Sequence, residues 1–311
     1  MSAAVDSKLE ALTQLEQNLN AAPVQRLHHA SIDSSGVEVF IKREDLLHPI
    51  ISGNKWRKLK YILQHALGSG AEHLISMGGP WSNHLHALSF VGQQLGIKTT
   101  GIIRGEMPTN KSATLQDMQR WGMDLLFVSR AEFRELRNFH AHDSQPGLDY
   151  DGYWIPEGGA STLALKGVAE LTDEIGEVKF DTITLACGTG TTLAGLASAA
   201  KQNQFLGFAA LKGADFLCDD VASLLPSEKH NWSINLDYHF GGFAKTEQRL
   251  FDFMLAFETQ TSIPLDPIYT GKMMFGLFEL IKQGYFASGH KILAIHTGGL
   301  QGRAGFQLQS G

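Results

Sequence analysis

The chain has few cysteines, no excess of positive charge and no long apolar run. Only two of its 311 residues are cysteines, Cys187 and Cys218, so a disulfide framework is not expected. Its 26 Lys and Arg residues against 32 Asp and Glu give a formal charge of −6, which argues against nucleic acid as the main partner. No apolar run approaches the roughly 20 residues of a membrane span, and the N-terminal residues lack the apolar core of a signal peptide. We therefore expect a cytoplasmic protein without membrane contact.

The composition is that of a folded α/β protein. Hydrophobic residues make up 43% of the chain, enough for a sizeable core, and the length suggests about two domains. Short β-rich runs alternate with amphipathic stretches, a pattern that favours parallel sheets covered by helices. Strands are expected at residues 37–45, 73–79, 98–105, 123–130, 181–188 and 291–296, and helices at residues 54–70, 82–96, 114–122, 161–176 and 191–200.

A glycine-rich loop joins a predicted strand to a predicted helix in the segment CGTGTTLAG, residues 187–195. Glycines let backbone N–H groups turn inward, and a helix N-terminus attracts anions. A Walker loop would need a lysine, and a dinucleotide fingerprint would need glycine in place of Leu193. The loop fits a smaller phosphate, although an ordinary strand-to-helix turn is an equal alternative. The candidate contacts are Gly188, Thr189, Gly190, Thr191 and Thr192.

The segment SGNKWRKLKY, residues 52–61, places Lys55 after Gly-Asn at the start of a predicted helix. A lysine becomes a Schiff-base nucleophile when desolvation or nearby positive charge lowers its pKa, and Arg57, Lys58 and the helix N-terminus act in that direction. The alternative is a solvated, lysine-rich helix face, which is the commoner origin of such a pattern.

The segment GGPWSNHLHA, residues 78–87, again leads from glycines into a helix start. Ser82, Asn83 and His84 put a hydroxyl, an amide and an imidazole beside free N–H groups, which suits a substrate carboxylate. Helix capping alone is the alternative. The zinc patterns HExxH and paired CxxC and the hydrolase pattern GxSxG are missing from the sequence, so no metal is expected.

Two further segments carry side chains suited to chemistry. In DPIYTGKMMFGL, residues 266–277, Tyr269 could donate a proton, and the alternative is a core helix with a tyrosine at its entrance. In HTGGLQG, residues 296–302, a predicted strand ends at Thr297 and two glycines. Open α/β sheets place their sites at such strand ends.

Six pieces in chain order carry a family resemblance: IKREDL, SGNKWRKLKY, GGPWSNH, GTGTTLAG, DPIYTGK and HTGG. They resemble the pyridoxal-phosphate enzymes of the tryptophan synthase β-subunit fold, fold type II. The matching branch contains 1-aminocyclopropane-1-carboxylate deaminase and D-cysteine desulfhydrase. The pieces extend from Ile41 to Gly299 and so cover most of the chain.

The resemblance implies two three-layer α/β domains with mostly parallel sheets, the smaller inserted into the larger. We expect a large pyridoxal-phosphate-binding domain from residues 1–61 and 164–311, and a small one from residues 62–163. Sites of this kind usually lie in the cleft between domains. A homodimer is expected from the resemblance and from the general frequency of two-fold oligomers.

Residue by residue, the resemblance makes Lys55 the lysine that bonds pyridoxal 5′-phosphate. Lys58 and the loop at residues 188–192 would contact its phosphate, Asn83 its 3′-oxygen, and Thr297 would lie near its pyridine nitrogen.

The resemblance also implies which residues surround a small amino-acid substrate. Ser82 and His84 would lie near its Cα and carboxylate, together with Asn83, and Tyr269 would face it from the other side. Trp81 and Thr270 would also contact the substrate. Pro80 and Trp81 depart from the family pattern, and Trp81 could narrow the pocket or pack in the core. His86 stands where the branch often carries arginine.

The residues at positions 270 and 297 favour one activity within the branch. The resemblance implies an acidic and an apolar residue there in the deaminases, and small hydroxyl residues in the desulfhydrases. This chain has Thr270 and Thr297. A neutral partner leaves the pyridine ring less electron-demanding, which suffices for β-elimination of a good leaving group. We therefore expect a lyase that converts D-cysteine to pyruvate, ammonia and sulfide.

In this lyase, Lys55 and Ser82 are the candidates for removing the α-proton, and Tyr269 is a candidate acid. The alternatives are a 1-aminocyclopropane-1-carboxylate deaminase, which gives 2-oxobutyrate and ammonia, and a non-catalytic protein that binds a phosphate ligand.

Overall fold

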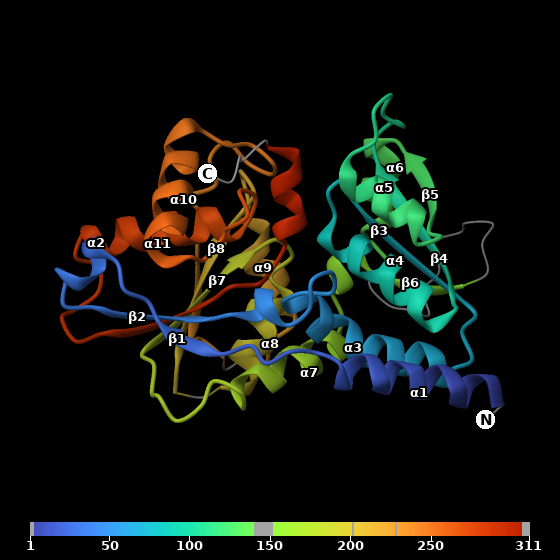
Figure 1. Ribbon diagram of the computed structural model, residues 1–311, viewed down its shortest axis with the longest axis horizontal. Coiled ribbons are helices and arrows are strands. Elements are labelled where there is room, and N and C mark those ends of the chain that lie inside the picture. The colour runs from blue at the N-terminus through green and yellow to red at the C-terminus, as the bar shows by residue number, and fades with distance from the viewer. Residues whose placement is uncertain (1–2, 140–151, 201, 228, 307–311) are drawn as a thin grey trace. The chain divides into compact units, whose positions relative to one another are not determined.

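The computed structural model describes residues 3–139, 152–200, 202–227 and 229–306. Contacts divide the chain into two compact units (Figure 1). Unit 1 comprises Met1–Asn20 and His48–Gly167, and unit 2 comprises Ala21–Leu47 and Val168–Gly311. Each unit is built on a sheet of its own with helices packed against it, and nearly all neighbouring strands are parallel. The expected α/β fold with mostly parallel sheets is therefore confirmed.

Unit 1 contains a four-stranded parallel sheet in the order β5-β4-β3-β6. Its core cluster is apolar, as expected for a parallel sheet that helices cover, and includes Ile75, Met77, Phe133 and Trp154. The elements are α1 (Ala3–Gln17), α3 (Asn54–Gly68), β3 (His73–Gly78), α4 (Asn83–Leu95), β4 (Lys98–Arg104), α5 (Ala113–Arg120), β5 (Asp124–Val128), α6 (Arg130–Leu136), β6 (Tyr153–Ile155) and, at the boundary with unit 2, α7 (Thr162–Ala169).

Unit 2 contains a six-stranded sheet in the order β1-β2-β10-β7-β8-β9, in which only β1 is antiparallel to its neighbour among the described strands. Its core lies between the sheet and α11, whose buried side chains include Met273, Met274 and Leu277. The elements are β1 (Val24–Arg26), α2 (Ala30–Asp33), β2 (Glu38–Lys42), β7 (Thr182–Cys187), α8 (Thr191–Ala199), β8 (Gln204–Ala209), α9 (Phe216–Ser223), β9 (Trp232–Asn235), α10 (Gln248–Thr261), α11 (Thr270–Lys282) and β10 (Lys291–Ile295).

Local sequence signals account for the start and end of α4. The Ser82 hydroxyl accepts a hydrogen bond from the Leu85 N–H at 3.2 Å, which caps the first turn. The helix ends at Gly96, whose backbone is left-handed with φ 59°. Both signals stand in the sequence, and the predicted helix at residues 82–96 matches α4 closely.

Other elements depart from the prediction. The helix predicted at residues 161–176 ends at Ala169 and continues as a 3-10 turn, Glu170–Thr172. Strand β8, Gln204–Ala209, is not among the predicted elements. A Cβ at Gly207 would lie 2.6 Å from the Cys187 Sγ on the neighbouring strand, so tertiary packing favours glycine at this position. Residues 140–151, between the predicted strand at residues 123–130 and the predicted helix at residues 161–176, lie outside the described residues.

The compact units also differ in their bounds from the predicted domains. The predicted boundary after residue 61 falls inside α3, a continuous helix that packs against α1 and α4. Residues 1–20 and 48–61 therefore belong to unit 1, together with the segment predicted as the small domain. The reason is that α3 packs along its length against α1 and α4, which both belong to unit 1.

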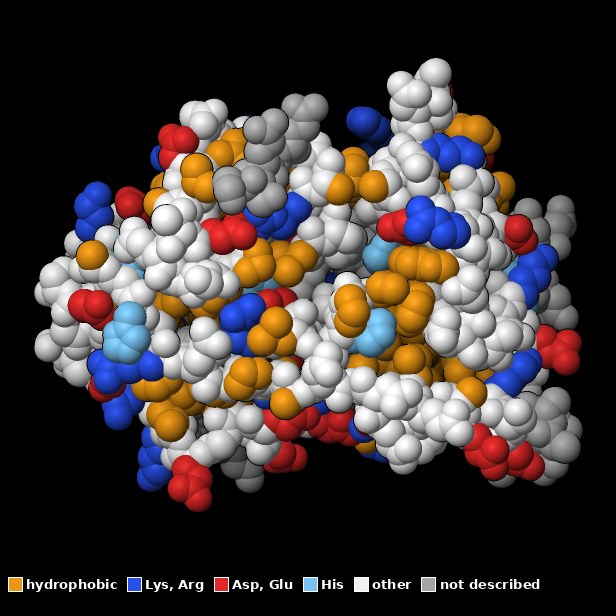
Figure 2. Space-filling view, viewed as in Figure 1, with side chains coloured by type: hydrophobic (Ala, Val, Ile, Leu, Met, Phe, Trp, Pro, Cys, Tyr) orange, Lys and Arg blue, Asp and Glu red, His pale blue; other side chains and the backbone are white. Residues whose placement is uncertain are grey.

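The surface in Figure 2 mixes basic and acidic side chains, and no broad basic area covers the coloured residues of this face. Among the described residues, no helix is both long and apolar enough to cross a bilayer. No three His, Cys, Asp or Glu side chains gather as metal ligands in the part of the chain that the structure describes.

Candidate active site

Two lysines of the first turns of α3 stand at the predicted cofactor site of unit 1. Lys55 is half-buried, and its Nζ donates a hydrogen bond to the Asn54 Oδ1 at 2.6 Å. Lys58 is 4% exposed, and its Nζ donates to the carbonyl oxygen of Gly158 at 3.2 Å. Both ammonium groups are thereby held at the start of α3. The lysine pattern at residues 52–61 is therefore more than a solvated helix face.

His84 is buried beneath these lysines and is held in one tautomer. Its Nε2 lies 2.9 Å from the Ser76 Oγ, and Ser76 donates its own proton to the Ile155 carbonyl oxygen at 2.8 Å. The Ser76 hydroxyl must therefore accept a proton from His84 Nε2, which leaves Nδ1 as an acceptor. Burial, and then the charges of Lys55 and Lys58, lower the pKa of His84 to about 3. A neutral imidazole cannot neutralise a substrate carboxylate by charge.

Ser82, Asn83 and Trp81 surround the start of α4. Ser82 caps the helix, and because its Oγ only accepts in that bond, its proton stays available to donate elsewhere. A Cβ at Gly78 would lie 2.5 Å from this Oγ, so glycine is needed for the turn to close on Ser82. Asn83 and Trp81 are half-buried, which leaves part of each side chain accessible. The predicted helix capping is confirmed, and it is compatible with a ligand at the same helix start.

His86 has a packing role within unit 1. Its side chain is 3% exposed, its Nε2 lies 3.3 Å from an Asp117 oxygen, and its ring meets the Trp121 ring edge-on at 4.7 Å. Burial lowers the pKa of His86, and Asp117 opposes this effect. These contacts tie α4 to α5 within unit 1.

The predicted phosphate loop of unit 2 leads into a helix start without a side-chain cap. It connects β7 to α8, and the residue before α8 is Gly190 with φ 70°, which provides no side-chain cap for the first turn. A Cβ at Gly190 would collide with the Val221 Cγ2. The hydroxyls of Thr189 and Thr191 lie 3.0 Å apart at the same helix start. Backbone N–H groups and hydroxyls without a basic side chain suit the phosphate of pyridoxal phosphate.

Tyr269 lies against this loop. A Cβ at Gly188 would lie 3.1 Å from the Tyr269 Cε1 and 3.5 Å from its hydroxyl, so the glycine makes room for the ring. The tyrosine is half-buried at the N-terminus of α11, with the Phe243 ring edge-on at 6.1 Å. The structure thus brings together two segments that are about 80 residues apart in the sequence.

Asp266 holds the turn that presents Tyr269, a function that the sequence analysis did not assign. Its Oδ1 accepts from the N–H groups of Ile268 and Tyr269 at 2.9 and 2.8 Å. Its Oδ2 accepts from the N–H and the hydroxyl of Thr270 at 2.9 and 2.7 Å. The Thr270 hydroxyl proton is therefore used inside the turn. An aspartate just ahead of a predicted helix is a capping signal that could have identified this residue.

Thr297 follows β10 at the sheet edge from which the phosphate loop leaves β7. The two strands are parallel neighbours, so their carboxyl ends meet at one edge. Thr297 is 7% exposed, and the preceding residue, His296, is anchored by its Nε2 to the Pro264 carbonyl oxygen at 2.8 Å. Within unit 2, the phosphate loop, Tyr269 and Thr297 thus stand at positions compatible with one ligand.

Lys272, in the segment that begins at Asp266, has a structural role. Its Nζ is buried and donates to the carbonyl oxygens of His239 and Gly242 at 2.9 and 2.7 Å. Burial lowers the pKa of Lys272 to about 8, and Asp266 opposes the effect. The ammonium therefore ties α11 to the loop that follows β9.

Comparisons with known proteins agree with the geometry. Residues 15–298 match the family described as pyridoxal-phosphate dependent enzyme. A proposed 1-aminocyclopropane-1-carboxylate deaminase of Pyrococcus horikoshii is 32% identical over 90% of this chain and 90% of its own length. A bifunctional D-cysteine desulfhydrase/1-aminocyclopropane-1-carboxylate deaminase of Arabidopsis thaliana is 30% identical over 86% of this chain and 74% of its own length.

Among solved structures, a homologue of 1-aminocyclopropane-1-carboxylate deaminase superposes with a TM-score of 0.77, 29% identity and 99% coverage of both chains. The family model covers most of the chain, and the relatives match nearly its full length. The predicted cofactor and enzyme class are therefore confirmed. The chain belongs to the family of pyridoxal-phosphate dependent enzymes.

Proposed function

We propose that this enzyme removes the β-substituent of D-cysteine and so produces pyruvate, ammonia and sulfide. The observation that carries the proposal is the pair of neutral hydroxyl residues, Thr270 and Thr297, at positions where the deaminase branch is expected to carry an acidic and an apolar residue. The Asp266 carboxylate beside Thr270 does not replace that acid, because hydrogen bonds from residues 268–270 occupy both of its oxygens.

The predicted site residues are proposed to bind the cofactor in the following way. Lys55 would hold pyridoxal phosphate covalently, and Lys58 and residues 188–192 would bind its phosphate. Asn83 would bind its 3′-oxygen, and Thr297 would donate to or accept from its ring nitrogen. The bound cofactor supplies an electron sink that acidifies the substrate Cα–H.

The chain's own groups then move protons. Lys55 Nζ, or the Ser82 hydroxyl, takes the α-proton as the Cβ–S bond breaks, and the Tyr269 hydroxyl donates a proton to the departing sulfur. The released enamine takes up water and yields pyruvate and ammonia. His84 brings no positive charge to the substrate, because burial lowers its pKa to about 3 and it is neutral at physiological pH. Trp81 and Asn83 complete the proposed substrate contacts.

The activity of the purified holoenzyme on three compounds tests the substrate. We expect sulfide and pyruvate from D-cysteine, with less from L-cysteine and no 2-oxobutyrate from 1-aminocyclopropane-1-carboxylate. The variant Lys55→Ala should lose the visible absorbance of the bound cofactor and at least about a hundredfold in activity. Lys60→Ala is a matched control, since Lys60 lies on the same helix and pairs with Glu16 at 2.6 Å.

Each result decides between the alternatives. Full activity of Lys55→Ala would refute the proposed mechanism. 2-Oxobutyrate from the cyclopropane substrate without sulfide from D-cysteine would make the enzyme a deaminase, an activity that the names of several relatives carry, as others carry the desulfhydrase. Turnover of none of the three compounds would refute both substrates.

The proposal also includes a homodimer and a cytoplasmic location. Two-fold dimers are the commonest assemblies among soluble homo-oligomers in general. Both cysteines, Cys187 and Cys218, are free thiols, as expected in a reducing compartment.

A further inference from the structure

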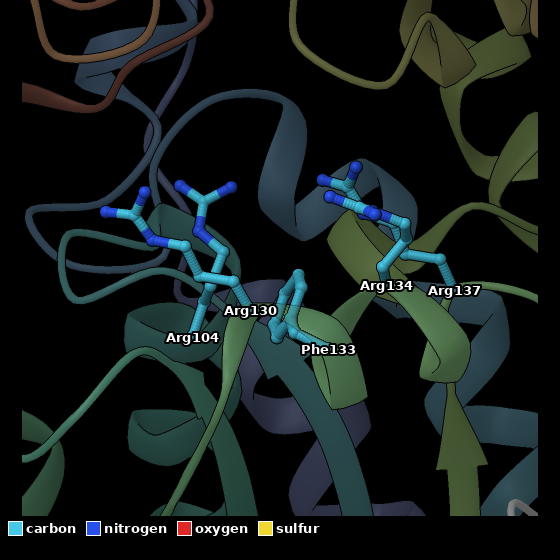
Figure 3. A pocket seen from close by; sticks show the side chains of 5 residues that line it. All are labelled: Arg104, Arg130, Phe133, Arg134 and Arg137. Atoms are coloured by element: carbon cyan, nitrogen blue, oxygen red, sulfur yellow. The ribbon is translucent and has the colours of Figure 1, made fainter.

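A cavity of about 310 Å³ in unit 1 is lined by Phe133 and four arginines (Figure 3). We call it the arginine pocket. In Figure 3 the four guanidinium groups point to the same side, two on either side of Phe133. None of these residues belongs to the proposed active site, so the pocket is independent of the proposed function. The arginines are Arg104, Arg130, Arg134 and Arg137.

The spacing of the arginines concentrates positive charge on one helix face. Arg130 and Arg134 are four residues apart on α6, and Arg137 follows three residues later at the end of the helix. Side chains at these spacings are neighbours on a helix surface, so their like charges repel. Arg104 adds a fourth charge from the end of β4. An anion bound at this face would relieve the repulsion between these charges.

Contacts with Phe133 fix two of the four guanidinium groups. The guanidinium carbons of Arg104 and Arg137 lie 5.7 and 5.6 Å from the ring centroid, within cation–π range. The ring is 2% exposed and belongs to the core of unit 1. These two arginines are therefore preorganised by the core.

Acidic side chains of the described chain neutralise only part of the positive charge of the arginine pocket. Glu157 pairs with Arg137 at 2.5 Å. Among the described residues, Arg130 and Arg134 form neither an ion pair nor a hydrogen bond, and both are exposed. The described residues that line the pocket include no acidic side chain. Two positive charges thus face the cavity without a partner on the described chain.

We propose that the arginine pocket binds a small phosphate-bearing molecule. A phosphate group carries up to two negative charges at neutral pH, which matches Arg130 and Arg134, and its oxygens accept the paired N–H donors of a guanidinium group. The volume is at the lower end for ligand sites, about 300–1,000 Å³, so the ligand is compact.

Calorimetric titration of the holoenzyme with inorganic pyrophosphate tests the proposal, with cofactor absorbance recorded throughout. We expect saturable binding at one site without loss of cofactor. The double variant Arg130→Gln/Arg134→Gln should bind at least tenfold more weakly. The control Lys98→Gln/Arg120→Gln also removes two exposed charges from unit 1 and should bind within twofold of the unaltered enzyme.

Three outcomes would overturn the proposal. The first is no saturable binding to the unaltered enzyme. The second is equally weakened pyrophosphate binding in both double variants, which would point to an effect of general charge. Displacement of the cofactor with no difference between the variants would likewise point to binding at the loop at residues 188–192. The third is binding of citrate as tight as that of pyrophosphate, which would mean that the pocket selects charge and not phosphate. Circular dichroism checks that both double variants are folded.

Discussion

The imidazole of His84 differs chemically from what its place in the sequence suggests. The residue follows Ser-Asn at a helix start, a position that predicts contact with a substrate carboxylate. In the structure its Nε2 proton is committed to Ser76, and burial keeps the ring neutral. A contact with substrate could therefore come only through the neutral ring, while Lys55 and Lys58 supply the positive charge of this region.

Burial of His84 makes the stability of the protein depend on pH. Its pKa is about 3 in the folded protein and 6.5 in the unfolded chain, so the unfolded chain binds the additional proton between these values. The contribution of His84 is complete above pH 6.5 and is lost as the pH falls toward 3. Between pH 7 and about pH 4 it should reduce the unfolding free energy by roughly 2–3 kcal/mol.

Urea unfolding of the unaltered protein and of His84→Gln across this pH range measures the effect as a difference. The glutamine amide can still donate to Ser76 but does not titrate, so the variant should lose that part of the pH dependence. His230→Gln, at an exposed position, is the matched control. Identical pH dependence of the unaltered protein and His84→Gln would contradict a buried, neutral His84.

At the scale of the element, the loop between β7 and α8 runs from the end of a strand to a helix start without a side-chain cap. It contains Gly190, whose backbone is left-handed. Gly190→Ala would force a side chain into the left-handed region and against Val221. We expect it to weaken cofactor binding at least tenfold and to destabilise the protein by about 1–3 kcal/mol. Absorbance titration with pyridoxal phosphate and urea unfolding give the two quantities.

The variant Gly213→Ala is the control for Gly190→Ala. It introduces the same left-handed backbone strain without a steric clash like that with Val221. Gly213 has φ 64°, but a Cβ there meets nothing within 4 Å. This variant should lose about 1 kcal/mol of stability and keep its cofactor affinity. If Gly190→Ala bound the cofactor as tightly as Gly213→Ala does, the loop would not be the phosphate site.

The sequence predicts those elements best whose signals are local. Ser82 and Gly96 delimit α4, and the glycines and threonines of residues 188–192 identify a loop before a helix, because capping and left-handed turns depend on adjacent residues. The end of α7 at Ala169 and the strand β8 depend on packing against distant residues, which periodicity does not record. The roles assigned to the individual site residues stay predictions.

At the scale of the whole molecule, the mass in solution is the quantity to measure. A homodimer should give twice the chain mass of 34.0 kDa in light scattering at micromolar concentration. A mass of one chain, unchanged by added pyridoxal phosphate, would contradict the dimer.

The sequence by itself determined the family, the cofactor and the α/β fold, because these rest on six short segments whose order and local chemistry can be read directly. Only the tertiary structure decided which residues act on one another. Ser76 fixes the tautomer of His84, Asp266 holds the turn at Tyr269, and Arg104 joins the arginines of α6. Each of these relationships depends on burial or on the direction of a side chain in three dimensions. Neither quantity is encoded in the spacing of residues along the chain.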